Sequence, residues 1–352
     1  MSDPSKLIFV SMHLGDEIFE VGRLALLDRN IVFEYTSEFI QTGIELSPFK
    51  LPLRPGVFRC EDRLFEGLFG VFNDSLPDGW GRLLLDRQLM AQQQNPGALN
   101  PLDRLRHVGN DGMGALLYQP AHLHHETIKT RNLDHIAHNI MAFQTKNDEQ
   151  HIDELLKLTG SSAGARPKIL ITHENAPWIV KFRSSIDPED IGAIEYAYHL
   201  LAKAAGLELP EAQLMPSKNG PGYFAVKRFD RTKHGPLHMH TLSGLLHADH
   251  RIPSLDYETV LKATAWLTKS HEETLKQYRA CVFNVVFHNR DDHAKNFSFL
   301  MSEKGEWHVS PAYDLTFSSG PNGEHSTTVS GEGRAPSLTH LMRLAESADI
   351  KK

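Results

Sequence analysis

The spacing of hydrophobic and polar positions changes along the chain. Between residues 7 and 45, short apolar runs such as Ile31–Tyr35 alternate with turns that contain Gly and Asp, which is typical of a small antiparallel sheet. Two helices are expected next, one over Leu83–Met90 with Asp78 as its N-cap and one that ends at Gly109. The first part of the chain therefore predicts a mixed unit of strands and helices.

Farther along, the pattern is first mixed and then mostly helical. Strands are predicted at Trp178–Phe182 and from Gly222 into a charged exit. Helices are expected over Ile191–Ala205, Thr241–His247, Tyr257–Leu267, Glu272–Phe287 and Ser337–Ala348. In the first of these helices, Ile194, Tyr198, Leu201 and Ala205 form an apolar stripe that Glu195 borders.

Composition narrows the class of protein. The chain has 352 residues, of which 40% are hydrophobic and 23% charged, so it has room for two or three domains with sizeable cores. The net charge of −7 disfavours a protein built to coat nucleic acid. Cys60 and Cys281 are too few for a disulfide framework, and neither a signal peptide nor an apolar run of membrane length is visible. We therefore expect a cytoplasmic protein that does not contact membranes.

A polar loop near the end of the chain holds the strongest chemical signal. An apolar run ends at Phe287, and Asp291 and Asn296 follow with a spacing of five. This is the spacing of the protein-kinase catalytic loop, where Asp orients the attacking hydroxyl and Asn holds magnesium. Asp314 is placed to be a second Mg²⁺ ligand, and Lys295 could neutralise a transferred phosphoryl group. Asp292 is out of this spacing and is expected to tolerate substitution better.

Other interpretations of this loop remain open. His288 and His293 could bind a metal, although five residues separate them rather than the four of a helical zinc pair. A metal-dependent nuclease or phosphatase could use Asp291, Asp292, His293 and Asp314, and the loop could also be solvated without a catalytic role.

Two upstream segments carry further candidate residues. Lys181 stands in an apolar strand and needs a partner unless it reaches the surface, and Glu195 is a candidate for the ion pair that fixes ATP phosphates in kinases. The small residues of 160–165 would let backbone N–H groups approach a phosphate, with Lys168 adding charge. This segment is not a Walker loop, and a plain hairpin is the alternative.

The motifs also resemble a known family. Asp291-Asp292-His293-Ala294-Lys295-Asn296-Phe297-Ser298 and Ser310-Pro311-Ala312-Tyr313-Asp314-Leu315 are similar to the catalytic and magnesium motifs of HipA-like serine/threonine kinases, the toxins of bacterial toxin–antitoxin modules. Ser161, Gly164, Ala165 and Lys168 match the family's phosphate loop in order. The segments 76–81 and 109–115 resemble the family's N-terminal subdomain, and we assign them packing and partner contact rather than catalysis.

The resemblance implies an α+β, two-lobed, protein-kinase-like fold with an N-terminal subdomain. The expected units are residues 1–125, the N-lobe 126–230 and a mainly helical C-lobe 231–352. The implied cofactors are ATP and Mg²⁺. Catalysis is assigned to Asp291 and Lys295, and metal binding to Asn296 and Asp314. Cofactor contacts are assigned to Ser162, Ala163, Gly164, Ala165, Lys168, Lys181, Glu195, Lys227, Arg228, Phe229, His293, Asn296 and Asp314.

The resemblance also implies a biological role. A toxin kinase of this type would phosphorylate a translation component such as an aminoacyl-tRNA synthetase and would be restrained by a helix-turn-helix antitoxin similar to HipB, with DNA reached only through that antitoxin. Autophosphorylation is expected at Ser161, with Ser162 as an alternative acceptor. Family members usually continue with further helices, so a catalytically weak scaffold is one alternative. A kinase for small molecules or lipids is another.

Overall fold

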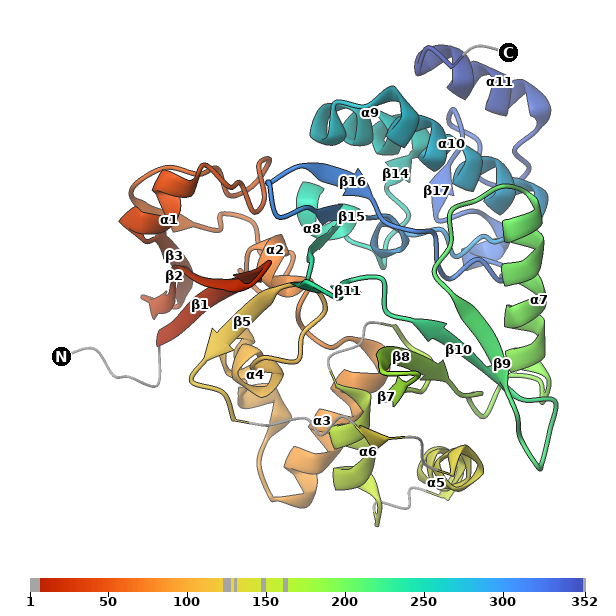
Figure 1. The fold of residues 1–352 in the computed structure, drawn as a ribbon, viewed down its shortest axis with the longest axis horizontal. Coiled ribbons are helices and arrows are strands. Elements are labelled where there is room, and N and C mark those ends of the chain that lie inside the picture. Colours follow the sequence, from red (N-terminus) through yellow and green to blue (C-terminus); the bar gives the residue numbers. More distant parts are fainter. Residues whose placement is uncertain (1–6, 123–127, 130–131, 147–149, 161–163, 351–352) are drawn as a thin grey trace.

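The computed structural model describes residues 7–122, 128–129, 132–146, 150–160 and 164–350. Figure 1 shows the N-terminal sheet on the left, a second sheet at the lower right and the C-terminal helices at the upper right. These three parts follow the order of the chain.

The N-terminal sheet is antiparallel and has five strands. Their order in space is β4 (Val57–Arg59), β3 (Asn30–Tyr35), β2 (Glu17–Leu27), β1 (Leu7–Leu14) and β5 (Leu116–Gln119). Burial alternates along β1, as expected for a strand with one face against a core. The predicted small antiparallel sheet is therefore present.

Helices follow or interrupt the strands of this part of the chain. They are α1 (Ser37–Thr42), α2 (Gly70–Asn73), α3 (Gly79–Ala91) and α4 (Pro101–Val108), with a short 3-10 turn at Pro96–Ala98. A capping box starts α4, because Asn100 accepts from the N–H of Asp103 and the Asp103 carboxylate accepts from the N–H of Asn100.

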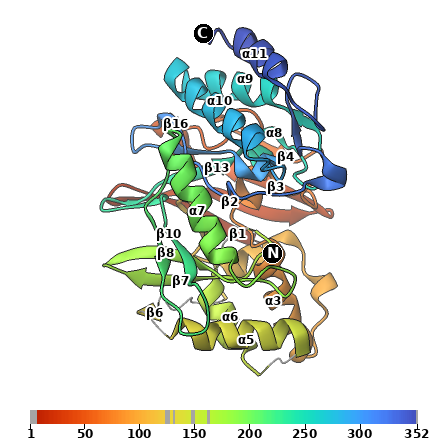
Figure 2. The same ribbon diagram turned by 90° about the vertical axis from the view of Figure 1, so that its right-hand side faces the viewer.

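The second sheet also has five strands. They run in the order β6 (Ile128–Lys129), β7 (Lys168–His173), β8 (Ala176–Lys181), β10 (Tyr223–Lys227) and β9 (Ala212–Met215). The helices of this part are α5 (Leu133–Lys146), α6 (Ile152–Thr159) and α7 (Ile191–Ala204). In Figure 2, α7 stands between this sheet and the C-terminal helices.

The C-terminal part is mainly helical. Its helices are α8 (Leu242–Leu246), α9 (Tyr257–Thr268), α10 (His271–Val286) and α11 (Leu338–Ser347), with 3-10 turns at Ala294–Asn296 and Pro321–Gly323. Its short strands are β11 (Arg231–Thr232), β12 (Gly235–Pro236), β13 (His238–Thr241), β14 (Leu255–Asp256), β15 (Ser298–Met301), β16 (Trp307–Val309) and β17 (Thr327–Thr328).

Two hydrophobic cores cross the boundaries expected from the sequence. The larger core joins residues of the N-terminal sheet such as Phe33 and Tyr118 to Leu242 and Tyr257 of the C-terminal part. The second core lies under the second sheet and includes Trp80 of α3. The helix α3 thus packs with the predicted N-lobe, although it precedes residue 126 in the chain.

The apolar stripe predicted on α7 is wrong in part. Leu201 is 45% exposed, whereas Glu195 and Ala202 are buried. The helix turns its charged Glu195 inward because that side chain has a cationic partner there, which outweighs the simple apolar pattern. Over the described residues, no helix is long and apolar enough to cross a membrane.

Candidate active site

The polar loop after α10 is held against the Asp314 segment. Asn289 Nδ2 donates to Asn284 Oδ1 at 3.0 Å and to the carbonyl oxygen of Asp314 at 2.9 Å. The Tyr313 hydroxyl donates to the carbonyl oxygen of Lys295 at 2.6 Å. Side chains on each segment therefore fix the backbone of the other, and the motifs that the sequence singled out lie together.

The adjacent residues Asp291 and Asp292 have opposite environments. Asp292 is fully buried, and its carboxylate accepts from the Tyr257 hydroxyl and the Ser326 N–H, both at 2.9 Å, with His325 Nδ1 at 2.8 Å. The side chain of Asp291 is 63% exposed. The expectation that Asp292 tolerates substitution does not fit this geometry, because Asp292 anchors the loop from within while Asp291 projects from it.

The position of Asp291 affects its ionisation. Desolvation by the surrounding protein, and then the negative charges of Asp314 and Asp292, raise the pKa of Asp291, while His293 opposes them. His293 Nε2 lies 4.0 Å from Asp291 Oδ1. Its Nδ1 is buried without a hydrogen-bond partner among the described residues. A raised pKa makes this carboxylate a stronger proton acceptor than an unperturbed Asp.

Lys181 joins the second sheet, α7 and the Asp314 segment. Its ammonium lies 3.1 Å from Glu195 Oε2 and also forms an ion pair with Asp314. Glu195 is 5% exposed and also faces Arg166, whose Nη1 lies 3.7 Å from Glu195 Oε1. The predicted Lys181 and Glu195 partners thus meet in space, and Lys181 does not extend into solvent.

Asp314 and Asn296, the two predicted metal ligands, carry oxygens of the kind that Mg²⁺ prefers. Desolvation opposes a charge on Asp314, but the ammonium groups of Lys181 and Lys168 outweigh it and hold the pKa of Asp314 well below its usual range. Asn296 Nδ2 donates to the carbonyl oxygen of Asp291 at 2.6 Å, and this bond does not use the Asn296 amide oxygen. An ionised carboxylate and an amide oxygen are hard ligands of the kind that Mg²⁺ takes.

The described end of the predicted phosphate loop lies beside two charged groups. Ser161, Ser162 and Ala163 lie outside the described residues, whereas Gly164 and Ala165 are within them. The Lys168 ammonium lies so close to Gly164 that a Cβ atom there would collide with it. Burial lowers the pKa of Lys168, and Lys181 adds to this effect. The Gly164 N–H donates to the carboxylate of Asp78.

At the predicted hinge, the side chain of Arg228 differs from its expected role in cofactor binding. Its Nε and Nη2 atoms lie 2.9 and 2.7 Å from the Asp230 carboxylate, and Nη2 also donates to the carbonyl oxygen of Gly112 at 3.2 Å. Its backbone N–H donates to the carbonyl oxygen of Pro177 at 2.9 Å. These donors of Arg228 are occupied by the protein itself, which ties the hinge to the N-terminal domain.

The two other hinge residues border the candidate site differently. The N–H of Lys227 donates to the carbonyl oxygen of Glu211 at 2.8 Å, so an adenine contact by Lys227 would have to use its carbonyl oxygen. The ring of Phe229 stacks on Tyr313 with centroids 5.6 Å apart. Phe229 therefore lies next to the Asp314 segment, and its adenine contact stays a prediction.

Asp78 is a site residue that the sequence did not predict. This residue lies in the segment assigned to packing, yet its carboxylate binds both the Gly164 N–H and the Lys295 ammonium, the latter at 2.5 Å. More than 200 positions separate Asp78 from Lys295 in the chain. Spacing could not reveal this contact, and the unusual run Pro77-Asp78-Gly79-Trp80 was the available signal.

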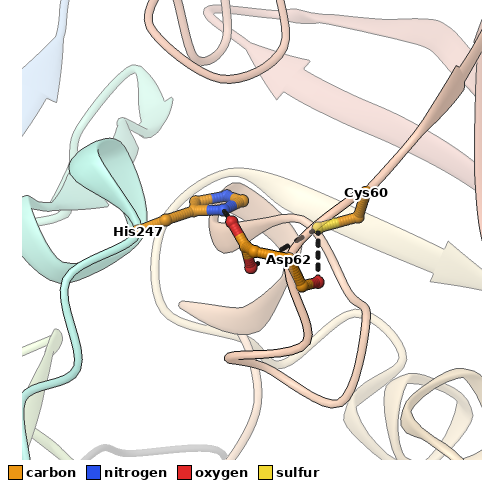
Figure 3. A group of neighbouring side chains, drawn as sticks. All are labelled: Cys60, Asp62 and His247. Carbon is orange, nitrogen blue, oxygen red and sulfur yellow. Dashed lines mark hydrogen bonds and ion pairs between the residues drawn. The ribbon is translucent and has the colours of Figure 1, made fainter.

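A separate group of polar side chains lies between the N-terminal and C-terminal parts (Figure 3). Cys60, Asp62 and His247 have potential ligand atoms within 4.8 Å of one another. His247 Nε2 accepts from the Gly70 N–H at 3.0 Å, so Nδ1 carries the proton and faces Asp62 at 2.5 Å. A metal on Nδ1 would move that proton to Nε2, where it would face the Gly70 N–H. Burial also raises the pKa of Cys60 to about 11, which disfavours the thiolate that a metal needs. The three side chains therefore form a hydrogen-bonded contact between the N-terminal and C-terminal parts.

Two family models match the chain. Residues 12–119 match the HipA N-terminal domain, and residues 160–352 match the HipA-like C-terminal domain. "Putative kinase Y4dM" of Sinorhizobium fredii is 30% identical over 154 residues, which are 39% of this chain and 36% of that protein. A "Putative kinase" of Haemophilus influenzae is 25% identical over 135 residues, 34% of this chain and 39% of that protein. The matches span less than half the length of these relatives.

The fold has a solved counterpart. HipA of Shewanella oneidensis MR-1, solved with HipB and operator DNA, superimposes with a TM-score of 0.69 at 18% sequence identity, covering 97% of this chain and 85% of that one. This similarity confirms the α+β, two-lobed architecture that the family resemblance implies. With both terminal domains matched in order, the chain belongs to the HipA-like family.

Proposed function

We propose that the protein transfers the γ-phosphoryl group of ATP, with Mg²⁺, to a serine or threonine of another protein. One observation carries this proposal: the ion pair of Lys181 with Glu195 meets the carboxylate of Asp314 beside a loop that exposes Asp291. In phosphoryl transfer the protein contributes mainly positioning and charge stabilisation, and these residues offer both.

Each residue has a distinct role in the proposed reaction. Mg-ATP would supply the phosphoryl group and neutralise charge on its oxygens. Asp291 would orient the acceptor hydroxyl and accept its proton, and Asn296 and Asp314 would hold the metal. Lys181 and Lys168 would bind phosphate oxygens, and Lys295 would neutralise the group in transfer. The backbone of Gly164 and Ala165, together with Ser162 and Ala163, would line the phosphates, and Lys227 and Phe229 would flank the adenine.

The proposed biological role is that of a toxin in a toxin–antitoxin module. The relative from Shewanella oneidensis was solved with HipB and operator DNA, which supports a HipB-like antitoxin as partner. In this proposal the antitoxin has a helix-turn-helix fold, and the protein would reach DNA only through it. The proposed substrate is a translation component such as an aminoacyl-tRNA synthetase in the cytoplasm. Autophosphorylation at Ser161, with Ser162 as the other acceptor, would place negative charge in the loop that receives ATP and would switch the kinase off.

The geometry disfavours a nuclease that uses the same acids. That alternative needs Asp291, Asp292 and Asp314 around a metal. The carboxylate of Asp292 is fully buried and accepts hydrogen bonds from the Tyr257 hydroxyl and the N–H groups of Ser326 and Thr327. Both oxygens of Asp292 already accept hydrogen bonds inside the protein. Only two of the three carboxylates that a two-metal centre would use are therefore available to a metal.

Labelled ATP distinguishes these activities. The wild type and Asp291→Asn are incubated with γ-labelled ATP, Mg²⁺ and a cytosolic extract, and labelled proteins are identified by mass spectrometry. We expect Asp291→Asn to lower transfer by about 10²- to 10⁴-fold with Mg-ATP affinity within about threefold, because the carboxylate acts mainly in the transition state. Equal labelling by both proteins, or digestion of nucleic acid without labelling, would contradict the proposal.

A further inference from the structure

The turn that starts α3 reaches into the candidate active site. Asp78 is the N-cap residue of α3, but its side chain makes no capping bond to its own helix. One carboxylate oxygen accepts from the Gly164 N–H, and the other pairs with Lys295 Nζ at 2.5 Å. A residue type that normally caps a helix here binds a phosphate-loop amide and a catalytic-loop ammonium.

The backbone of this turn makes a reciprocal contact. The N–H of Trp80 donates to the carbonyl oxygen of Gly164 at 3.1 Å, so the same loop residue both gives to and receives from the turn. Gly79 has a φ of +42°, and a Cβ atom there would lie 2.5 Å from Ala165 Cα. Only glycine allows this approach without displacing the loop. The indole of Trp80 donates to Thr159 Oγ1 at 3.1 Å, which fixes the turn on α6 as well.

The charges of the contact are matched. Burial opposes ionisation of Asp78, but the Lys295 ammonium and the Gly164 N–H outweigh it and lower its pKa, so the carboxylate is charged at neutral pH. Lys295 is 9% exposed, so its ammonium needs a counter-charge within the protein. Asp78 supplies that charge and restricts a flexible side chain to one direction.

We infer that Asp78 is a positioning residue through which the N-terminal domain orients Lys295 and the Gly164 end of the phosphate loop. Because α3 packs in the core under the second sheet while Lys295 belongs to the C-terminal part, the carboxylate fixes the two sides of the site relative to each other. This inference rests on the proposed phosphoryl transfer, in which Lys295 faces the group in transfer. It gives the Asp78–Gly81 turn a role in the reaction beyond packing.

A double-mutant cycle tests whether Asp78 acts through Lys295. Full-length wild type, Asp78→Asn, Lys295→Gln and the double variant are compared by kcat, KM for ATP and melting temperature. Asp86→Asn is the matched control, because Asp86 is an acid of the same helix and, within the described part of the chain, pairs only loosely with Arg82 at 3.8 Å. A structural role alone would lower the melting temperature without separating kcat from KM.

We expect Asp78→Asn to lower kcat by about 10- to 10²-fold, because a misplaced charge costs this much in an oriented site, and to change KM for ATP by less than about threefold. In the Lys295→Gln background, Asp78→Asn should lower kcat by less than about twofold more, since the residue it orients is already gone. Asp86→Asn should match the wild type. Multiplying effects in the double variant, or a kcat of Asp78→Asn within about threefold of the wild type, would overturn the inference.

Hydrogen exchange supplies a readout that does not need catalysis. In Asp78→Ala, exchange in a peptide that contains the Gly164 amide should be faster by at least about tenfold, because this amide loses its acceptor. Unchanged exchange in an otherwise active kinase would overturn the positioning role alone. A wild type that labels no protein, itself included, would overturn the proposed function and the catalytic part of this inference together. If the wild type is inactive and exchange in Asp78→Ala is faster, Asp78 has only a structural contact with the loop.

Discussion

Replacement of Asp230 by alanine should destabilise the protein strongly. Asp230 is fully buried, and its carboxylate accepts from Arg228 Nη2 and Arg231 Nη1, both at 2.7 Å, and from the Gly114 N–H at 2.8 Å. Asp230→Ala leaves two guanidinium groups without their shared counter-charge. Removing one partner of a buried charge pair costs about 3–5 kcal/mol of unfolding free energy.

The corresponding shift in melting temperature follows from the size of the chain. With an unfolding entropy of about 2.1 cal/mol/K per residue, a loss of about 3–5 kcal/mol lowers the midpoint by roughly 4–7 °C. Glu34→Gln is the control, because Glu34 accepts from Arg23 Nη2 at the same 2.7 Å but the two side chains are 37% and 59% exposed. An exposed pair contributes about 0–1 kcal/mol. Differential scanning calorimetry that gives equal shifts for both variants would refute the reasoning.

The same carboxylate predicts a pH dependence. Burial opposes its ionisation, but Arg228 and Arg231 lower the pKa of Asp230 to about 2, below the unfolded value of about 3.9. A lowered folded pKa stabilises the fold above the unfolded value, and this stability is lost as pH falls from about 4 to about 2. The difference amounts to about 2.5 kcal/mol. Acid titration of Asp230→Ala should therefore show a shallower loss of stability in that range than the wild type.

Three further predictions concern the site. Asp314→Ala should weaken Mg-dependent ATP binding about tenfold or more in calorimetry, because an anionic ligand is lost, and unchanged affinity would exclude this role. Asp291 must be ionised to act and its pKa is raised, so kcat/KM should begin to fall on acidification at a pH above the ordinary Asp pKa of about 3.9. His293→Gln should move this acid limb of the pH–rate profile to higher pH, because His293 lowers the pKa of Asp291. An acid limb that stays in place would exclude an interaction between His293 and Asp291. Mass spectrometry should find phosphate on Ser161 only when Asp291 is present; phosphate in Asp291→Asn would contradict autophosphorylation.

Some local features of the candidate site could be predicted from the sequence. The five-residue spacing of Asp291 and Asn296 is a property of one loop, and the burial of α10 before it follows from an apolar run. The meeting of Lys181 with Glu195 was also accessible, because a lysine in a buried strand demands an acid and the next helix carries one. Both features depend only on neighbouring elements and on the free-energy cost of a buried charge.

Contacts between distant segments could not be predicted in this way. Asp78 has the sequence signature of a helix cap, and only the packing of α3 brings it to Lys295. The position of Arg228 in the sequence does not show whether its side chain faces a nucleotide or the buried Asp230. Leu201 is exposed because the buried face of α7 is the one that carries Glu195. Each of these outcomes depends on tertiary packing.

The core that the N-terminal sheet shares with the C-terminal helices has a consequence for synthesis on the ribosome. About 120 residues separate Tyr118 at the end of the sheet from Leu242, where its partners in that core begin. At a synthesis rate of about 5–20 residues per second, the apolar face of the sheet stays exposed for roughly 6–25 s before the residues that cover it are made. Transiently uncovered apolar faces aggregate, so the nascent N-terminal domain should be a client of chaperones, and its yield should fall when it is expressed without residues 242–344.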